Sequence, residues 1–199
     1  MMTGQPAGEP KKAKKKLVTL VAAGVALLAL AGASLVYLLT PNADADPLIP
    51  KKDWVSVVPN QVDFAAPELS LTDLEGNPVA LVDHLGQVVL VNNWAFWCPP
   101  CRAELPELQA YYEAHRQQPF TAIGVEAGDE KVDVDYHVKL FKITYPVWLD
   151  PKQQSMMAIQ SFSLPNSYVI DKKGRVRLTW VGVIDRAMLE KYVTPLLEE

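Results

Sequence analysis

Cysteine is scarce in this sequence, which holds two among 199 residues. So few cysteines exclude a small secreted domain held together by several disulfides. The chain also lacks an excess of basic residues, since its net charge is −4 and its isoelectric point is about 5.4. Nucleic-acid binding depends on clustered positive charge, so no nucleic-acid partner is expected. Apolar residues make up 49% of the chain, too many for a disordered protein.

Charge is missing altogether from residues 17–39, a run of 23 residues. As a helix this run would be about 35 Å long, enough to cross a hydrocarbon core of about 30 Å. Five lysines precede it within residues 11–16 and are expected to stay on the cytoplasmic side. The sequence therefore predicts a basic cytoplasmic N-terminus (1–16), one transmembrane anchor (17–39) and a C-terminal part outside the cytoplasm.

A cleaved signal peptide is the alternative for this N-terminal segment. Residues 31–33, Ala-Gly-Ala, have the small-residue spacing of a cleavage site. Cleavage there would leave the apolar residues 35–39 at the new N-terminus, which favours an uncleaved anchor. The expected location is thus the bacterial cytoplasmic membrane, crossed once.

Four prolines in residues 40–60 predict an extended linker, followed by a globular domain at 61–199. Apolar alternation and helical spacing give the expected order of elements in that domain. The order predicts an α/β fold with a central mixed β-sheet flanked by helices. The expected strands are 68–72 and 79–82, which form a hairpin, then 87–94, 120–125, 146–149, 167–170 and 175–181; the expected helices are 103–116, 131–141, 152–159 and 185–197.

Both cysteines lie in one Cys-x-x-Cys motif, Cys98-Pro99-Pro100-Cys101. The motif stands where a buried strand ends and a helix begins, a context typical of redox-active pairs. At the N-cap, Cys98 meets the unpaired amides and the positive dipole end of the helix, which stabilise a thiolate. Cys101 lies one turn further on the same face. We therefore expect Cys98 to be the exposed, attacking thiolate and Cys101 to resolve the mixed disulfide.

Other uses of two thiols are less favoured. A structural disulfide would constrain a loop of only two residues. A zinc site would need two further ligands, and His84, His115 and His137 have no ligand spacing, so no metal is expected. A peroxidatic cysteine usually stands in a Thr-x-x-Cys setting, whereas the residue three before Cys98 is Ala95. Two thiolates can bind Cu(I), so a copper chaperone or copper-site assembly factor stays as the alternative function.

The string from Val91 to Pro106, VNNWAFWCPPCRAELP, resembles the active-site signature of the TlpA/ResA/CcmG thiol–disulfide oxidoreductases, membrane-anchored members of the thioredoxin superfamily. The resemblance extends over about residues 66–199. It implies a thioredoxin-like fold with an extra N-terminal β-hairpin and no bound cofactor. It also implies that Leu164-Pro165 is the family's cis-proline loop, which lies against the cysteine pair.

The same resemblance supplies the other expected site residues. Pro165 joins the cysteines as a catalytic residue, and the expected substrate-binding residues are Trp97, Pro99, Pro100 and Leu164. The family uses an acidic residue near the pair as a proton relay. Here the stretch that should carry it is about two residues longer than expected, so Glu126, Asp129 and Glu130 are all candidates.

The sequence departs from the family pattern at two positions. Asn166 follows the cis-proline, where Thr or another small residue is usual, and Asn93 replaces a common Phe. Residues after the cis-proline also tune the redox potential, so the departure at Asn166 bears on the reaction's direction.

The leading hypothesis is an extracytoplasmic thiol–disulfide oxidoreductase that exchanges a disulfide with protein cysteines. Pro99 and Pro100 offer a thiolate no N–H, and nearby Glu104 and Glu107 disfavour another negative charge. The thiolate is then weakly stabilised, which predicts a reductant supplied by a membrane electron donor. Through the resemblance, cytochrome c maturation is one candidate pathway.

Overall fold

The structure, a computed structural model, describes residues 55–128 and 130–199. The predicted basic N-terminus, the predicted transmembrane anchor and most of the predicted linker lie outside the described residues, and so does the candidate acid Asp129. Among the helices of the described part, none is both long and apolar enough to cross a membrane.

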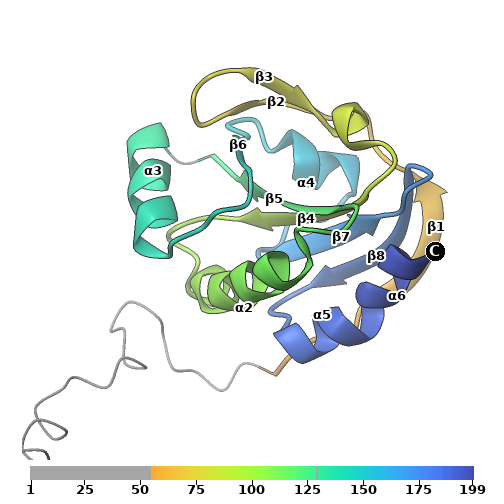
Figure 1. The fold of residues 1–199 in the computed structure, drawn as a ribbon. Coiled ribbons are helices and arrows are strands. Elements are labelled where there is room, and N and C mark those ends of the chain that lie inside the picture. The colour runs from red at the N-terminus through yellow and green to blue at the C-terminus, as the bar shows by residue number, and fades with distance from the viewer. Residues whose placement is uncertain (1–54, 129) are drawn as a thin grey trace, which may run out of the picture. The chain divides into compact units, whose positions relative to one another are not determined.

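One mixed sheet of eight strands organises the described residues, in the order β1-β8-β7-β4-β5-β6-β2-β3 (Figure 1). Strand β4 runs parallel to β5, and β5 parallel to β6, whereas the other neighbours are antiparallel. The predicted mixed central sheet is confirmed. The strands are β1 Asn60–Ala65, β2 Ser70–Asp73, β3 Pro78–Ala80, β4 Val88–Trp94, β5 Phe120–Glu126, β6 Val147–Leu149, β7 Asn166–Ile170 and β8 Arg175–Val181.

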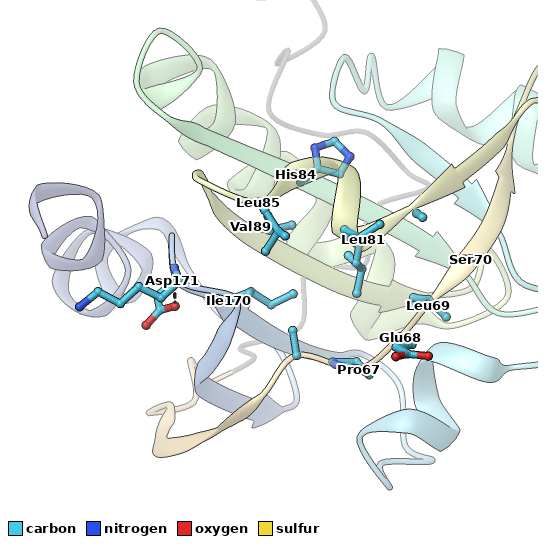
Figure 2. A pocket seen from close by; sticks show the side chains of 15 residues that line it. Pro67, Glu68, Leu69, Ser70, Leu81, His84, Leu85, Val89, Ile170 and Asp171 are labelled. Atoms are coloured by element: carbon cyan, nitrogen blue, oxygen red, sulfur yellow. Dashed lines mark hydrogen bonds between the residues drawn. The ribbon is translucent and has the colours of Figure 1, made fainter.

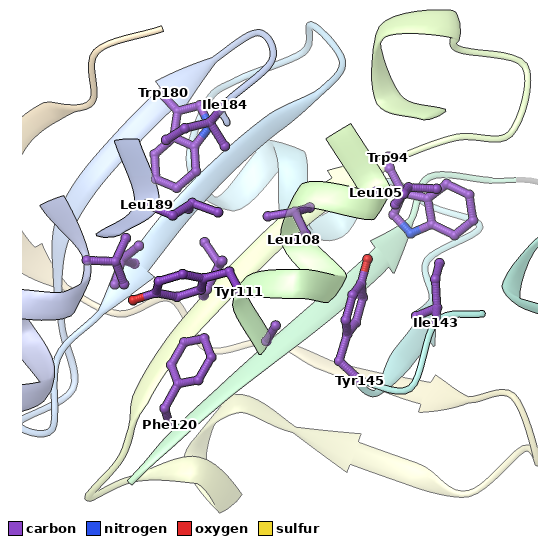
Figure 3. Packing of buried hydrophobic residues seen from close by; sticks show 14 of the residues in the cluster. Trp94, Leu105, Leu108, Tyr111, Phe120, Ile143, Tyr145, Trp180, Ile184 and Leu189 are labelled. Carbon is purple, nitrogen blue, oxygen red and sulfur yellow. The ribbon is translucent and has the colours of Figure 1, made fainter. Parts of the chain in front are cut away.

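Helices cover both faces of this sheet. On one face, the buried Leu105, Leu108 and Tyr111 of α2 pack with Leu189 of α5 and with the sheet (Figure 3). On the other face, Leu81 of the 3-10 helix η1 belongs to a second apolar cluster. The helices are η1 Leu81–His84, α2 Pro99–His115, α3 Lys131–Leu140, α4 Gln154–Ala158, α5 Arg186–Tyr192 and α6 Thr194–Glu198.

The burial of the central strands explains why most of their residues are apolar. All seven residues of β4 are buried, and so are all seven of β5. A strand covered by helices on both faces shows no polar alternation, so it appears in the sequence as a continuous apolar run. Because α2 connects these two parallel strands, it begins at the carboxyl end of β4, which fixes the place of the cysteine pair.

Strands β2 and β3 pair antiparallel around a turn stabilised by one carboxylate. Oδ1 of Asp73 accepts the backbone N–H groups of Glu75 and Asn77 at 2.9 and 2.8 Å. This arrangement is the Asx turn that the sequence Asp-Leu-Glu-Gly-Asn favours. Strand β2 also pairs with β6, so the β2–β3 hairpin forms one edge of the sheet.

Strand β1 was not expected, because residues 60–65 show no buried face. Five of its six residues are exposed, and it pairs with β8 more than one hundred residues away. The C-terminal helix expected at 185–197 is also two helices, α5 and α6, separated at Val193. Pro195 stands in the first turn of α6 and donates no N–H, which interrupts a continuous helix there.

Candidate redox site

The cysteine pair lies at the N-terminus of α2. Strand β4 ends at Trp94, three residues lead to Cys98, and Cys98 is the N-cap of the helix, as the motif's context predicted. Cys98 and Cys101 form a disulfide, with their Cα atoms 5.3 Å apart. The strand and the helix therefore hold both sulfur atoms at one end of a rigid βα unit.

The N-terminus of α2 stabilises negative charge on Cys98 less than most helix starts would. The Cys98 sulfur accepts the Cys101 N–H at 3.3 Å. Pro99 and Pro100, which fill the first two helical positions, have no N–H to offer. Arg102 directs its Nη1 to the carbonyl oxygen of Phe96, at 3.2 Å. The stabilisation thus comes from the helix dipole and one backbone amide.

Both cysteines are buried in the disulfide form, which corrects the expectation that Cys98 is exposed. The relative exposure is 4% for Cys98 and 0% for Cys101. Cys98 keeps the small accessible surface because it stands outside the first turn, whereas that turn covers Cys101. Trp97, directly before Cys98, is 58% exposed, so a large aromatic surface lies beside the one sulfur that a partner can approach.

The Leu164–Pro165 peptide bond is cis, as the resemblance implied. In the antiparallel pairing of β4 with β7, Asn93 faces Asn166, so Pro165 lies beside the end of β4. Its carbonyl oxygen accepts the Gly182 N–H at 2.8 Å. Leu164 packs against the apolar cluster that contains both cysteines. The cis-proline loop and the cysteine pair therefore belong to the same end of the sheet.

The candidate acids lie in different surroundings. Glu126 is fully buried at the end of β5, where the parallel register places it beside Trp94. Glu130 is exposed at the N-cap of α3. Asp129 lies outside the described residues. Of the two described candidates, Glu126 is the residue that the structure places beside the end of the cysteine-bearing strand.

Glu104 is a buried acid that the sequence analysis did not select as a site residue. It lies one turn after Cys101 on α2 and is fully buried. Burial raises the pKa of Glu104 to about 8, although hydrogen bonds from Asn92 and from the Ile184 backbone N–H work in the opposite direction. Its position was a usable signal, because residues 101, 104 and 108 share one helix face that is otherwise apolar.

A chain of side-chain hydrogen bonds joins Glu104 to the cis-proline strand. Nδ2 of Asn92 donates to Oε1 of Glu104 at 2.6 Å and to Oγ of Ser167 at 2.9 Å. The Ile184 N–H donates to Oε2 of Glu104 at 3.3 Å. These contacts fix the orientation of the carboxyl group between α2, β4, β7 and the segment before α5.

A hollow of about 450 Å³ lies near the start of β4, at the opposite end of that strand from the cysteines (Figure 2). Leu69, Leu81, Val89 and Ile170 line it, together with polar residues that include Asp171. Val89 stands near the start of β4, whereas the cysteines follow its end. The hollow is therefore separate from the redox pair. Among the described residues, no group of three or more His, Cys, Asp and Glu side chains is placed to hold a metal ion.

Curated relatives agree on one class of protein. The chain is 31% identical over 132 residues to the thiol-disulfide oxidoreductase ResA of Geobacillus kaustophilus, covering 66% of this chain and 76% of the relative. It is 30% identical over 128 residues to ResA of Bacillus subtilis, covering 64% and 72%.

Solved structures share the fold. A thiol:disulfide interchange protein of the thioredoxin family from Chlorobium tepidum superposes with a TM-score of 0.62 at 27% identity, covering 69% of this chain and 99% of that one. StoA from Bacillus subtilis gives 0.56 at 27% identity, covering 65% and 99%. Fold, cysteine pair and relatives together define a thioredoxin-like thiol–disulfide oxidoreductase. Residues 62–179 match the model of the AhpC/TSA family, and the chain belongs to that family.

Proposed function

We propose that this protein reduces protein disulfides outside the cytoplasm, with Cys98 as the attacking thiolate. The observation that carries the proposal is the Cys98–Cys101 pair at the start of α2, where Cys98 alone keeps accessible surface. The exposed Trp97 and the cis-proline loop flank that surface. An extended polypeptide can pair with loop backbone there, as strands do when they add to a sheet edge.

Reduction proceeds in two exchange steps. The Cys98 thiolate attacks one sulfur of the substrate disulfide, the substrate S–S bond breaks, and a mixed disulfide forms while the first substrate thiolate leaves and takes up a proton. The Cys101 thiolate then attacks the Cys98 sulfur and releases the second substrate thiolate. The substrate gains two electrons, and the protein becomes the Cys98–Cys101 disulfide.

The second step requires Cys101 to lose its proton inside the protein. Water cannot readily take that proton, because the Cys101 side chain is fully buried. Glu104, one turn along α2, and Glu126, at the end of β5, are the buried carboxyl groups of this region. We propose that the ionised form of Glu104 accepts the proton, because Glu104 shares the helix face of Cys101 and burial raises its pKa to about 8, close to the pKa of about 8.5 of a free thiol.

The expected partners follow from the proposal that this protein reduces its substrates rather than oxidising them. A reductant of protein disulfides ends each cycle oxidised, so a dithiol electron donor in the membrane must reduce it again. Anchoring by residues 17–39 would keep the domain beside such a donor. The Cys-x-x-Cys-His haem-attachment sites of apocytochrome c, when oxidised, are a substrate of suitable chemistry, which makes cytochrome c maturation the proposed pathway.

A trapping experiment tests the proposal. The Cys101→Ser variant, reduced and mixed with a peptide that holds a Cys-x-x-Cys-His disulfide, is expected to accumulate a mixed disulfide through Cys98. The matched Cys98→Ser variant should form at least about tenfold less, because its remaining thiol is covered by the helix. Equal trapping by both variants, or trapping by neither, would contradict the proposed mechanism.

A further inference from the structure

Two buried asparagines face each other across β4 and β7. Asn93 and Asn166 are register partners, and both are fully buried. Nδ2 of Asn93 donates to Oδ1 of Asn166 at 2.8 Å. Nδ2 of Asn166 donates in turn to the carbonyl oxygens of Ser161 and Ser163, at 3.3 and 2.7 Å. The pair thus connects the cysteine-bearing strand to the backbone that precedes the cis-proline.

The chemistry of the partners fixes which way each amide points. Carbonyl oxygens accept hydrogen bonds and cannot donate, so the NH₂ group of Asn166 must face Ser161 and Ser163. Its Oδ1 then faces Asn93, which must present its own NH₂ group. Both amide hydrogens of Asn166 are used on the loop. Aspartate in the same place would present only acceptors to the two carbonyls, and alanine would present nothing.

The tethered segment, residues 161–164, carries two apolar side chains directly before the cis-proline. Phe162 is 67% exposed, although aromatic side chains of this size are usually buried. Leu164 is half-buried against the cluster that contains the cysteines. The loop begins where the Ser161 N–H donates to the Met156 carbonyl oxygen at 3.0 Å. Asn166 holds the part of the loop between that contact and the cis peptide bond.

We propose that Asn166 is a positioning residue that holds loop 161–164 so that Phe162 contacts an apolar side chain beside the disulfide of a polypeptide substrate. Asn93 acts one step further away by orienting the Asn166 amide. The proposal rests on the proposed disulfide exchange and names the substrate class that the site selects: polypeptide disulfides with apolar neighbours. The exchange rate of small disulfides that do not reach Phe162 should not depend on the hydrogen bonds of Asn166.

A matched control separates positioning from general stability. Tyr168 lies two residues after Asn166 on the same face of β7, and its hydroxyl group lies 3.3 Å from Oγ of Ser155. Tyr168 is also fully buried. Tyr168→Phe removes that contact, so it should lower the stability of the same region by about the contribution of one hydrogen bond. It leaves the loop carbonyls and both asparagines in place.

The experiment compares two disulfides with the full-length protein. Rate constants for exchange are measured with a synthetic peptide whose Cys-x-x-Cys disulfide is flanked by leucines, and with oxidised glutathione. The ratio of the two constants is the readout, because a general loss of folded protein lowers both alike. Asn166→Ala and Asn166→Asp are expected to lower the ratio about tenfold, and Asn93→Ala about threefold.

Non-additivity provides a second readout. Phe162→Ala should also lower the ratio about tenfold, and adding Asn166→Ala to it should lower the ratio no further, since Asn166 acts through the loop. Tyr168→Phe should leave the ratio unchanged. If the Asn166 variants do not fold, Asn93→Ala decides, because it disturbs only the orientation of the tether.

Three results would overturn the inference: an unchanged ratio in the folded asparagine variants, an additive double variant, or an equal effect of Tyr168→Phe. Failure of the proposed function looks different, because the unmodified protein would then exchange with neither disulfide.

Discussion

At the residue scale, Glu104 has a carboxyl group that stays protonated where an unfolded chain would release its proton. The usual pKa of a glutamate side chain is near 4.5, and burial raises that of Glu104 to about 8. Between these values the folded protein binds one more proton than the unfolded chain. The contribution of Glu104 to stability is therefore present below pH 4.5 and is lost as the pH rises toward 8.

The first prediction follows from this difference in protonation. Replacing Glu104 by Gln removes the titration but keeps the side-chain size. From pH 5 to 8, the unfolding free energy of the unmodified protein should fall relative to that of Glu104→Gln, by up to about 1.4 kcal/mol per pH unit. Urea unfolding of both oxidised proteins at four pH values measures this difference in unfolding free energy. Parallel pH profiles would show that Glu104 is ionised in the folded state.

The second prediction, also at the residue scale, concerns the reduction potential. One amide N–H faces the Cys98 sulfur in place of the several that a helix start usually offers, because Pro99 and Pro100 lack theirs. A weakly stabilised thiolate makes the dithiol form less stable, so the couple is reducing. We expect a midpoint nearer about −270 mV than about −120 mV, measured by equilibration with dithiothreitol buffers. A value above about −180 mV would instead indicate an oxidant or isomerase.

At the element scale, helix α5 depends on a side-chain cap at its N-terminus. Oδ1 of Asp185 accepts the Met188 N–H at 2.9 Å and closes the first turn of α5. This helix places the fully buried Leu189 against α2, the helix that begins at the cysteines. Local capping thus supports the packing of the redox helix.

The third prediction concerns this cap. Asp185→Ala should lower the unfolding free energy by about 1 kcal/mol, because a first-turn N–H loses its acceptor. Asp185→Asn keeps a side-chain oxygen in the same place and is the matched control, expected to lose well under half as much. Denaturant unfolding at neutral pH compares the two. Equal losses would show that the charge of Asp185, and not its acceptor geometry, stabilises α5.

At the scale of the whole molecule, the proposed function depends on which side of the membrane the domain occupies. The proposed orientation rests on the five lysines before the uncharged run, since basic residues stay in the cytoplasm. A domain on the outer side meets the oxidising compartment where protein disulfides form. This orientation remains a proposal from the sequence.

The fourth prediction tests that orientation. Protease added to intact spheroplasts of a bacterium expressing the full chain should digest residues 41–199, because they would face the outside. A cytoplasmic marker protein in the same cells should stay intact. Protection of the domain until the cells are lysed would reverse the topology and remove the proposed substrates.

Local signals in the sequence were enough to predict the redox pair and the buried central strands, whereas the cis-proline position came from the family resemblance. Cys98 and Cys101 are three residues apart, and the apolar runs of β4 and β5 indicate buried strands wherever they pair. Tertiary structure decided the rest, because burial and long-range pairing have no local signature. It made β1 a strand through β8, buried Glu104, and brought Asn93 within hydrogen-bond distance of Asn166, 73 residues away.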